Sequence, residues 1–348
     1  MKKELLMGTA LVSTLGAASV AEAVTATMSG NHQTGIEFDS PTSGTDTNAQ
    51  INDNNFTVSL SETTDGGMTI SSSFKVMDEN TKEDYDAGFT LAFTDGSKLD
   101  VIAAGNAAGS HAVSIPGSAG AEGVTTTSTN VAPTGLDFMT GSTALGVEYH
   151  TAADFLADGL KLSVSASTDN GAVNTATYRT DSHYAIGATY VTDLGDSAVT
   201  IGAGYTTTDG SRDGTGIDND PAGVHLGVSA VTGDLTVAVG FADGDSTAGD
   251  KSGAEYTADV VKAGVKYVTG DLTFNVGIAS GAATDNTMGS TSTGGSEDSK
   301  DVASASISYA VASGVTAILG YTDVDSSDEG VNDTTDGSAW YIGANMAF

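Results

Sequence analysis

Residues 223–242, GVHLGVSAVTGDLTVAVGFA, contain two short runs in which apolar residues alternate with small or polar ones, separated by Thr-Gly-Asp. In the second run, every other residue from Leu235 to Phe241 is large and apolar. An alternation with period two puts these side chains on one face of a β-strand. Because a short glycine-containing turn joins the two runs, the stretch predicts a β-hairpin with one apolar and one small or polar face.

The same hairpin pattern recurs along most of the chain. Residues 257–268 and 272–282 flank a second Thr-Gly-Asp, and residues 302–311 and 315–324 flank Ala-Ser-Gly. Sixteen strands are expected, an even number: Thr25–Asp39, Asn54–Thr63, Met68–Asp78, Asp84–Thr94, Lys98–Ala104, Thr143–His150, Leu160–Thr168, Ser182–Thr192, Ala198–Thr208, Gly223–Val231, Leu235–Ala242, Thr257–Val268, Leu272–Ala282, Val302–Val311, Val315–Val324 and Ser338–Phe348.

Short turns alternate with long polar connections, so all the long connections fall at one end of the predicted strands. Transmembrane β-barrels have this asymmetry, with short turns in the periplasm and longer loops outside, whereas a soluble sandwich or propeller has no reason for it. Aromatic residues near strand ends, such as Tyr149, Tyr267 and Trp340, suit the two membrane interfaces. We therefore predict an all-β fold, a 16-stranded antiparallel transmembrane β-barrel that is too wide for side chains to fill.

The first residues predict export. Lys2 and Lys3 precede an apolar run that ends in Ala21-Glu22-Ala23, the pattern of a cleaved secretory signal. This divides the chain into a signal peptide, 1–23, and a barrel, 24–348; an uncleaved anchor is the alternative. The chain has a net charge of −33 and lacks cysteine. Nucleic acid is therefore a poor partner, and a framework of hydrogen bonds must replace disulfides.

One stretch, Gly105–Gly141, lacks any run of comparable strand quality. A loop of this length inside a compact β-protein is usually either a functional element or a disordered connection. We expect it to fold into the barrel as its third long loop and to narrow the pore.

With these features the chain resembles the general diffusion porins of Gram-negative outer membranes, most closely the alphaproteobacterial type. The most specific local mark is the last strand, in which Trp340, Ile342, Ala344, Met346 and Phe348 alternate and the final residue is aromatic. The resemblance implies that the barrel-assembly machinery reads this ending, and that the barrel is a homotrimer among outer-membrane lipid and lipopolysaccharide. It also implies that Gly105–Gly141 is the constriction loop.

The charges of the family's constriction are only partly present. Arg179 and Arg212, the two arginines, lie in connections expected outside the membrane, so any transverse field must come from lysines. His150, His183 and His225 are expected to point inward, but on separate strands they lack the spacing of metal ligands. The candidate pore-lining residues are Lys75, Asp86, Lys98, Asp100, Glu122, Asp137, Glu148, Lys161, Lys262 and Lys266.

No catalytic motif is present in the sequence, so an enzyme is not expected. No cofactor is expected either, although Asp243-Gly244-Asp245 and residues 323–329 could offer oxygen ligands to Ca²⁺ in outer loops. The sequence favours passive diffusion of ions and small hydrophilic solutes, with a modest preference for cations. The alternatives are a structural or adhesive surface protein that displays acidic loops, and a substrate-specific channel.

Overall fold

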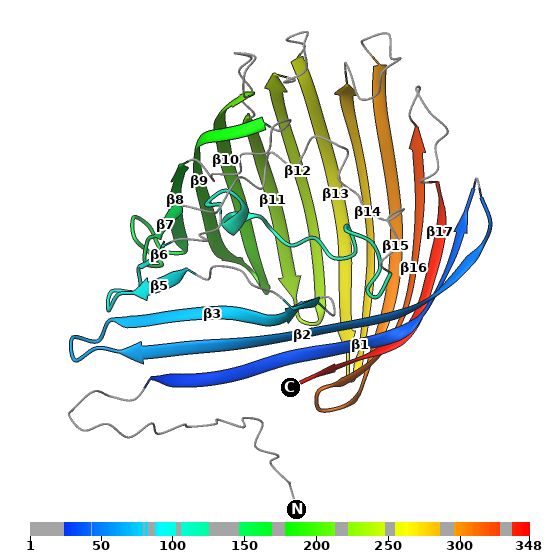
Figure 1. Ribbon diagram of the computed structural model, residues 1–348, viewed down its shortest axis with the longest axis horizontal. Helices are drawn as coiled ribbons and strands as arrows, with labels where there is room; N and C mark the ends of the chain where they lie inside the picture. The colour runs from blue at the N-terminus through cyan, green and yellow to red at the C-terminus, as the bar shows by residue number, and fades with distance from the viewer. Residues whose placement is uncertain are drawn as a thin grey trace, which may run out of the picture.

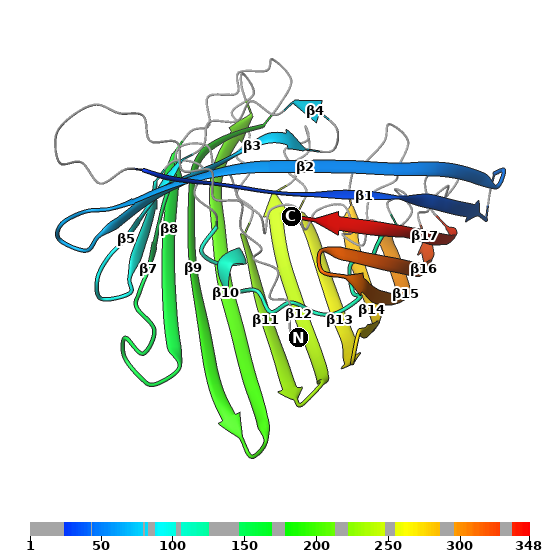
Figure 2. The ribbon, with the colours of Figure 1, turned by 90° about the horizontal axis from the view of Figure 1, so that it is seen from below.

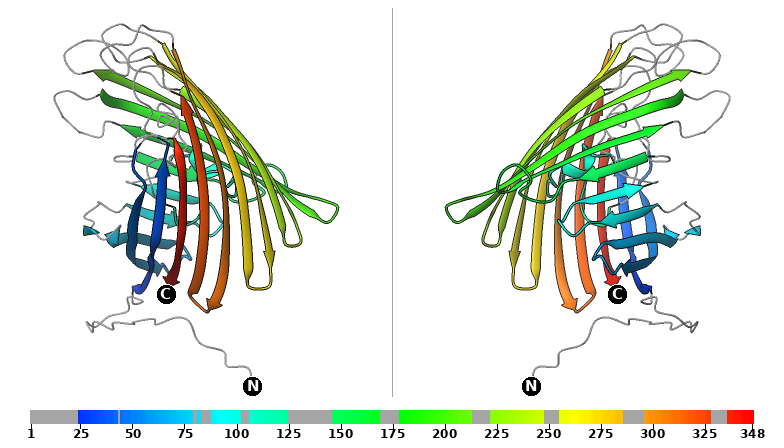
Figure 3. Two further views of the ribbon diagram at one scale, coloured as in Figure 1. Left: turned by 90° about the vertical axis from the view of Figure 1, so that its right-hand side faces the viewer. Right: turned by 90° about the vertical axis from the view of Figure 1, so that its left-hand side faces the viewer.

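A computed structural model shows a single sheet closed into a barrel (Figure 1). The strands tilt strongly against the barrel axis, and the tight turns gather at one end (Figure 3). The predicted signal peptide, 1–23, lies outside the described residues. The structure describes residues 24–42, 44–78, 81–82, 88–101, 106–124, 146–168, 178–212, 222–247, 255–285, 296–327 and 336–348.

The described chain forms seventeen strands and one short 3-10 helix, η1 (Gly109–His111). The strands are β1 (Thr25–Pro41), β2 (Thr47–Thr63), β3 (Thr69–Asp78), β4 (Thr81–Lys82), β5 (Phe89–Ala92), β6 (Lys98–Val101), β7 (Gly146–His150), β8 (Leu160–Thr168), β9 (Tyr178–Leu194), β10 (Ser197–Arg212), β11 (Ala222–Thr232), β12 (Leu235–Thr247), β13 (Glu255–Thr269), β14 (Leu272–Asp285), β15 (Ser296–Ala312), β16 (Val315–Ser327) and β17 (Gly337–Ala347). No helix among these residues is long and apolar enough to cross a membrane.

Sixteen of these strands form the closed ring, which confirms the predicted count. Each pairs antiparallel with its neighbours in sequence, β3 pairs with β5, and β17 closes the ring on β1. Among the described residues, the two-residue β4 pairs with β3 alone and stays outside the ring. A closed ring leaves no sheet edge unpaired, as lipid requires of a spanning sheet.

Several strands run further than the sequence indicated. β2 begins at Thr47 rather than Asn54, and β15 begins at Ser296 rather than Val302. The hydrogen-bonded ladder continues beyond the apolar band, where both faces are polar and hydrophobic alternation gives no sign of a strand. Arg179 and Arg212, expected in outer connections, accordingly lie in paired ends of β9 and β10.

Of the acidic residues considered for Ca²⁺, four lie on strands rather than in loops, while Asp328 and Glu329 lie outside the described residues. Asp243 and Asp245 belong to β12, and Asp323 and Asp325 belong to β16. By register all four share the face of Phe241 and Leu319, which point away from the lumen and stay exposed. They therefore form an acidic row on the outside of the barrel, above the apolar band.

The two faces of the wall differ as predicted. Large apolar side chains such as Val237, Val239 and Ile278 are exposed on the outer face. The inner face carries serine, threonine and glycine, and several of these side chains are buried, for example Thr206 and Thr322. Since the lumen of so wide a barrel cannot be filled by its own wall, another segment must cover them.

Candidate pore constriction

Residues Asn106–Val124, here called the docked segment, lie inside the barrel against its wall (Figures 1 and 2). The amide of Ala107 donates to Ser165 Oγ on β8 at 3.0 Å. Further along, Ser304 Oγ on β15 donates to the carbonyl of Gly117 at 2.5 Å, and the amide of Ala121 donates to Thr322 on β16 at 2.8 Å. The predicted inward fold is thus confirmed for this part of the insert, while residues 125–141 lie outside the described chain.

A seam of glycines on the inner wall lets the docked segment approach closely. A Cβ added to Gly264 on β13 would lie 1.9 Å from the carbonyl oxygen of Pro116, and one added to Gly240 would lie 2.4 Å from Ile115 Cδ1. Any larger side chain at these positions would push the segment away from the wall. The glycines that meet the segment in this way are Gly187, Gly202, Gly204, Gly227, Gly240, Gly264, Gly277 and Gly320.

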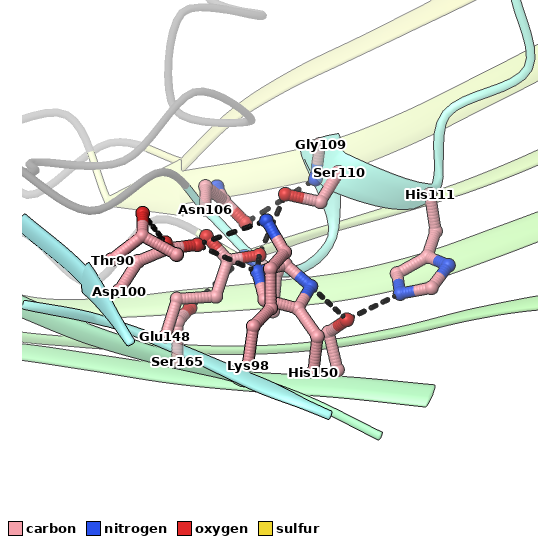
Figure 4. A network of polar contacts seen from close by, with 12 residues as sticks. Thr90, Lys98, Asp100, Asn106, Gly109, Ser110, His111, Glu148, His150 and Ser165 are labelled. Carbon is pink, nitrogen blue, oxygen red and sulfur yellow. Dashed lines mark hydrogen bonds and ion pairs between the residues drawn. The ribbon is translucent and has the colours of Figure 1, made fainter. Parts of the chain in front are cut away.

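The start of the docked segment is fixed by a polar network at β6 and β7 (Figure 4). Asn106 Oδ1 accepts the amide of Ala108 at 2.9 Å and so opens the turn that becomes η1. Ser110 in η1 donates to Glu148 Oε1 at 2.6 Å, and Glu148 is 1% exposed. Glu148 therefore anchors the segment to the wall.

His111, at the end of η1, joins the segment to two further strands. Its Nδ1 lies 2.6 Å from Thr189 Oγ1 on β9, and its Nε2 lies 2.6 Å from Ser163 Oγ on β8. Burial is the main cause that lowers the pKa of His111 to about 4, and the charge of Lys161 acts in the same direction. The ring is therefore neutral at pH 7, so that one nitrogen donates and the other accepts.

The three wall histidines singled out in the sequence all contact this network. His225 Nε2 lies 2.7 Å from the carbonyl oxygen of Ala108, and His183 Nε2 lies 2.6 Å from Thr206 and 3.5 Å from Asn106 Nδ2. His150 Nδ1 lies 2.7 Å from Ser163 Oγ. The role of each ring depends on contacts distant in sequence, which no local spacing could indicate.

Two cavities flank the docked segment in the lumen. One of about 570 Å³ is lined by Lys98 and Lys161 together with His111. Another of about 390 Å³ is lined by Lys266, by Val113 and by hydroxyls of the wall. These three candidate lysines therefore lie beside the segment, and Lys98 Nζ forms an ion pair with Asp100 Oδ2 at 3.1 Å.

The other candidate pore-lining residues do not form one group. Lys262 on β13 is half-buried on the inner face, opposite Gly240. Lys75 on β3 is exposed, and Glu122 accepts a hydrogen bond from Ser308 Oγ at 2.5 Å. Asp86 and Asp137 lie outside the described residues.

The pore-lining residues predicted from the sequence do not include the inward-facing carboxylates of β1 and β2. Glu37 is 1% exposed and pairs in register with Tyr341, whose ring packs against Gly123 of the docked segment. Asp39 and Asp53 share the inner face by register. The strict alternation of Ile36-Glu37-Phe38-Asp39 was the available signal, because it puts both acids opposite the apolar side chains.

The candidate assembly residues lie together on the outer face of β17. Phe348 follows the strand, and its ring stacks on Phe56 with 6.2 Å between centroids. Its amide and carbonyl both hydrogen-bond to Gly30, at 3.0 and 3.2 Å. Trp340, Ile342, Met346 and Phe348 are exposed, and Ala344 shares their face.

Solved structures with the same fold are low in sequence identity to this chain and include an outer-membrane protein and two porins. OmpT of Vibrio cholerae, in its trimer form, is 14% identical with a TM-score of 0.64 over 94% of this chain and 100% of that one. An anion-selective porin from Comamonas acidovorans is 10% identical with a TM-score of 0.63 over 93% and 100%. A mutant porin of Rh. blastica is 15% identical with a TM-score of 0.58 over the same shares.

No curated protein sequence matches the chain. The sequence model of the Gram-negative porins, in contrast, matches residues 8–329, which include nearly all of the barrel and the whole docked segment. With sixteen strands in a closed ring and a segment folded against its inner wall, the chain belongs to the Gram-negative porin family of outer-membrane channels.

Proposed function

We propose that this porin is a passive, water-filled channel for ions and small hydrophilic solutes. The observation that carries the proposal is the docked segment, which occupies lumen space along the wall from β7 to β16. A barrel that only displays surface loops has no need of such a segment. The cavities beside the segment are lined by hydroxyls and lysines, as expected for a path that water and polar solutes can follow.

The setting of the channel is proposed from the same family membership. Export by the signal peptide 1–23 and insertion by the barrel-assembly machinery would bring the barrel into contact with outer-membrane lipid and lipopolysaccharide. We further propose a homotrimer of the alphaproteobacterial type, which agrees with the acidic composition of the chain. Ca²⁺ at the outer acidic row remains part of this proposal.

We also propose a modest preference for cations. One porin of the same fold is anion-selective, so ion choice has to be argued from the charges of this chain. Inside the lumen both signs are present, because Glu37, Asp39 and Asp53 stand against Lys161, Lys262 and Lys266, while Lys98 is paired with Asp100. The net charge of −33 then decides the sign, since an acidic molecule concentrates cations near the pore.

Under a KCl gradient at low salt, the reversal potential should show cation preference, and Lys161→Ala should increase it. The preference should weaken as salt rises, because charges that act through water are screened within about 10 Å at ~0.1 M. Current recordings on planar bilayers that contain the purified protein would give the reversal potentials of the wild type and of Lys161→Ala. Anion preference at low salt would show that the lysines beside the docked segment outweigh the acidic residues in setting ion selectivity. Absence of current would refute the proposal that the barrel is a channel.

Removing Phe348 should lower the amount of barrel in the outer membrane and leave the conductance of each surviving channel unchanged. Its terminal ring is exposed, as a recognition signal requires, but it also stacks on Phe56. Phe56→Ala removes the stacking and keeps the terminal aromatic, so its membrane level should stay near that of wild type. Equal losses in both variants would assign Phe348 to packing instead.

A further inference from the structure

Asp100, Glu148 and His150 form a cluster of possible metal ligands at the edge of the docked segment (Figure 4). His150 Nε2 lies 3.0 Å from Asp100 Oδ2 and 3.3 Å from Glu148 Oε1. Glu148 and His150 are buried, at 1% and 4% exposure. We propose that these three side chains bind a divalent transition-metal ion of the Zn²⁺ type.

The spacing of the ligand atoms fits a single ion. Ligands at about 2.1 Å around a tetrahedral Zn²⁺ lie roughly 3.4 Å apart. The three atoms of the cluster all lie within 4.8 Å of one another, and two of the three separations are 3.0 and 3.3 Å. Small side-chain rotations would therefore bring one nitrogen and two oxygens onto the ion, with a fourth position left for water.

A hydrogen-bond chain outside the cluster supports the required form of His150. Metal binding at Nε2 needs the proton on Nδ1, which lies 2.7 Å from Ser163 Oγ. Ser163 can then donate to His111 Nε2 at 2.6 Å, and His111 Nδ1 can donate to Thr189 at 2.6 Å. Each of these three hydrogen bonds then has one donor and one acceptor, so the metal-binding tautomer of His150 leaves none of these groups without a partner.

Lys98 competes with a metal ion for Asp100. Its Nζ lies 3.1 Å from Asp100 Oδ2, the same oxygen that would bind the metal. The side chain is 39% exposed and borders the cavity of about 570 Å³, so it has room to swing away. Since Lys98 neutralises only one of two carboxylates, the site keeps a net negative charge that favours a divalent cation.

The donor set selects the class of metal. Imidazole nitrogen suits Zn²⁺, Cu²⁺ and Ni²⁺, whereas Ca²⁺ and Mg²⁺ prefer sites made only of oxygen. An ion at this position would also lie next to Ser110, which donates to Glu148. Binding would therefore strengthen the attachment of the docked segment to β6 and β7.

Calorimetric titration of ZnCl₂ into the chelator-treated, full-length protein in detergent tests the proposal. We expect one Zn²⁺ per barrel that excess Mg²⁺ does not displace. His150→Ala should abolish this binding, and Ser163→Ala should weaken it about 10- to 100-fold, as for other partners of metal-bound histidines. Lys98→Met should tighten it, because the competing ammonium group is gone.

His32→Ala is the matched control, since His32 lies on the outer face of β1 and hydrogen-bonds to Asn54. It should bind Zn²⁺ like the wild type. Should His150→Ala fail to fold on a heat-modifiability gel, Asp100→Asn replaces it and should bind more weakly. The proposal is overturned if the variant in the cluster retains wild-type affinity, if Lys98→Met does not bind more tightly, or if Mg²⁺ displaces Zn²⁺.

Discussion

Channels that lack residues 113–131 should conduct severalfold more current than wild-type channels while remaining folded barrels. The described part of this stretch, residues 113–124, contributes to no interstrand ladder, so its removal costs no hydrogen bond within the ring. Ser304 and Thr322 would lose their partners in the segment, but water in the lumen can replace them. The anchor at Ser110 and His111 is retained.

Single-channel recordings in planar bilayers would measure the change, and a shift in gel migration on heating would show that the unheated barrel is intact. A folded variant with unchanged conductance would mean that the docked segment does not limit the flow of ions. The constriction would then have to be sought elsewhere in the lumen.

Gly264→Val should disturb the channel without changing any charge. The first added carbon would lie 1.9 Å from the carbonyl oxygen of Pro116, a separation that forces the backbone of the docked segment away from β13. Overpacking of this kind costs about 1–3 kcal/mol. Because the displaced segment moves into the lumen, we expect lower, noisier conductance and faster protease cleavage within residues 113–124.

The matched control is Ser73→Val, which adds a similar side chain to the inner face of β3. Ser73 lies on the opposite wall and bonds to Ser59 on β2. Its substitution should leave conductance near the wild-type value. If both variants behaved alike, the effect would reflect any apolar side chain in the lumen, and the close fit of the glycine seam would be irrelevant.

The ring itself could be predicted from the sequence because its information is local. Each hairpin carries its own turn and its own alternation, as in residues 223–242, so counting the hairpins gives the size of the barrel. Parity also assigned faces correctly where a strand is apolar on one side. Parity does not reveal a strand where both faces are polar. The start of β2 was therefore predicted seven residues too late.

The attachment of the docked segment could not be predicted because it depends on contacts across the lumen. Gly202, Gly227 and Gly240 pair in register on successive strands, yet in sequence they look like ordinary small inner residues. Only the path of the segment shows why a side chain is excluded there. In the same way, Glu148 was predicted to line the pore, while the structure buries it under Ser110.

A water-filled pore narrowed by the docked segment should let small polar solutes pass without a specific binding site. Liposome swelling with a series of neutral sugars of increasing size tests it most directly. We expect swelling rates that fall steadily with solute size and do not saturate with concentration, and deletion of residues 113–131 should let larger sugars enter. Rapid, saturable uptake of one sugar with exclusion of smaller ones would contradict it.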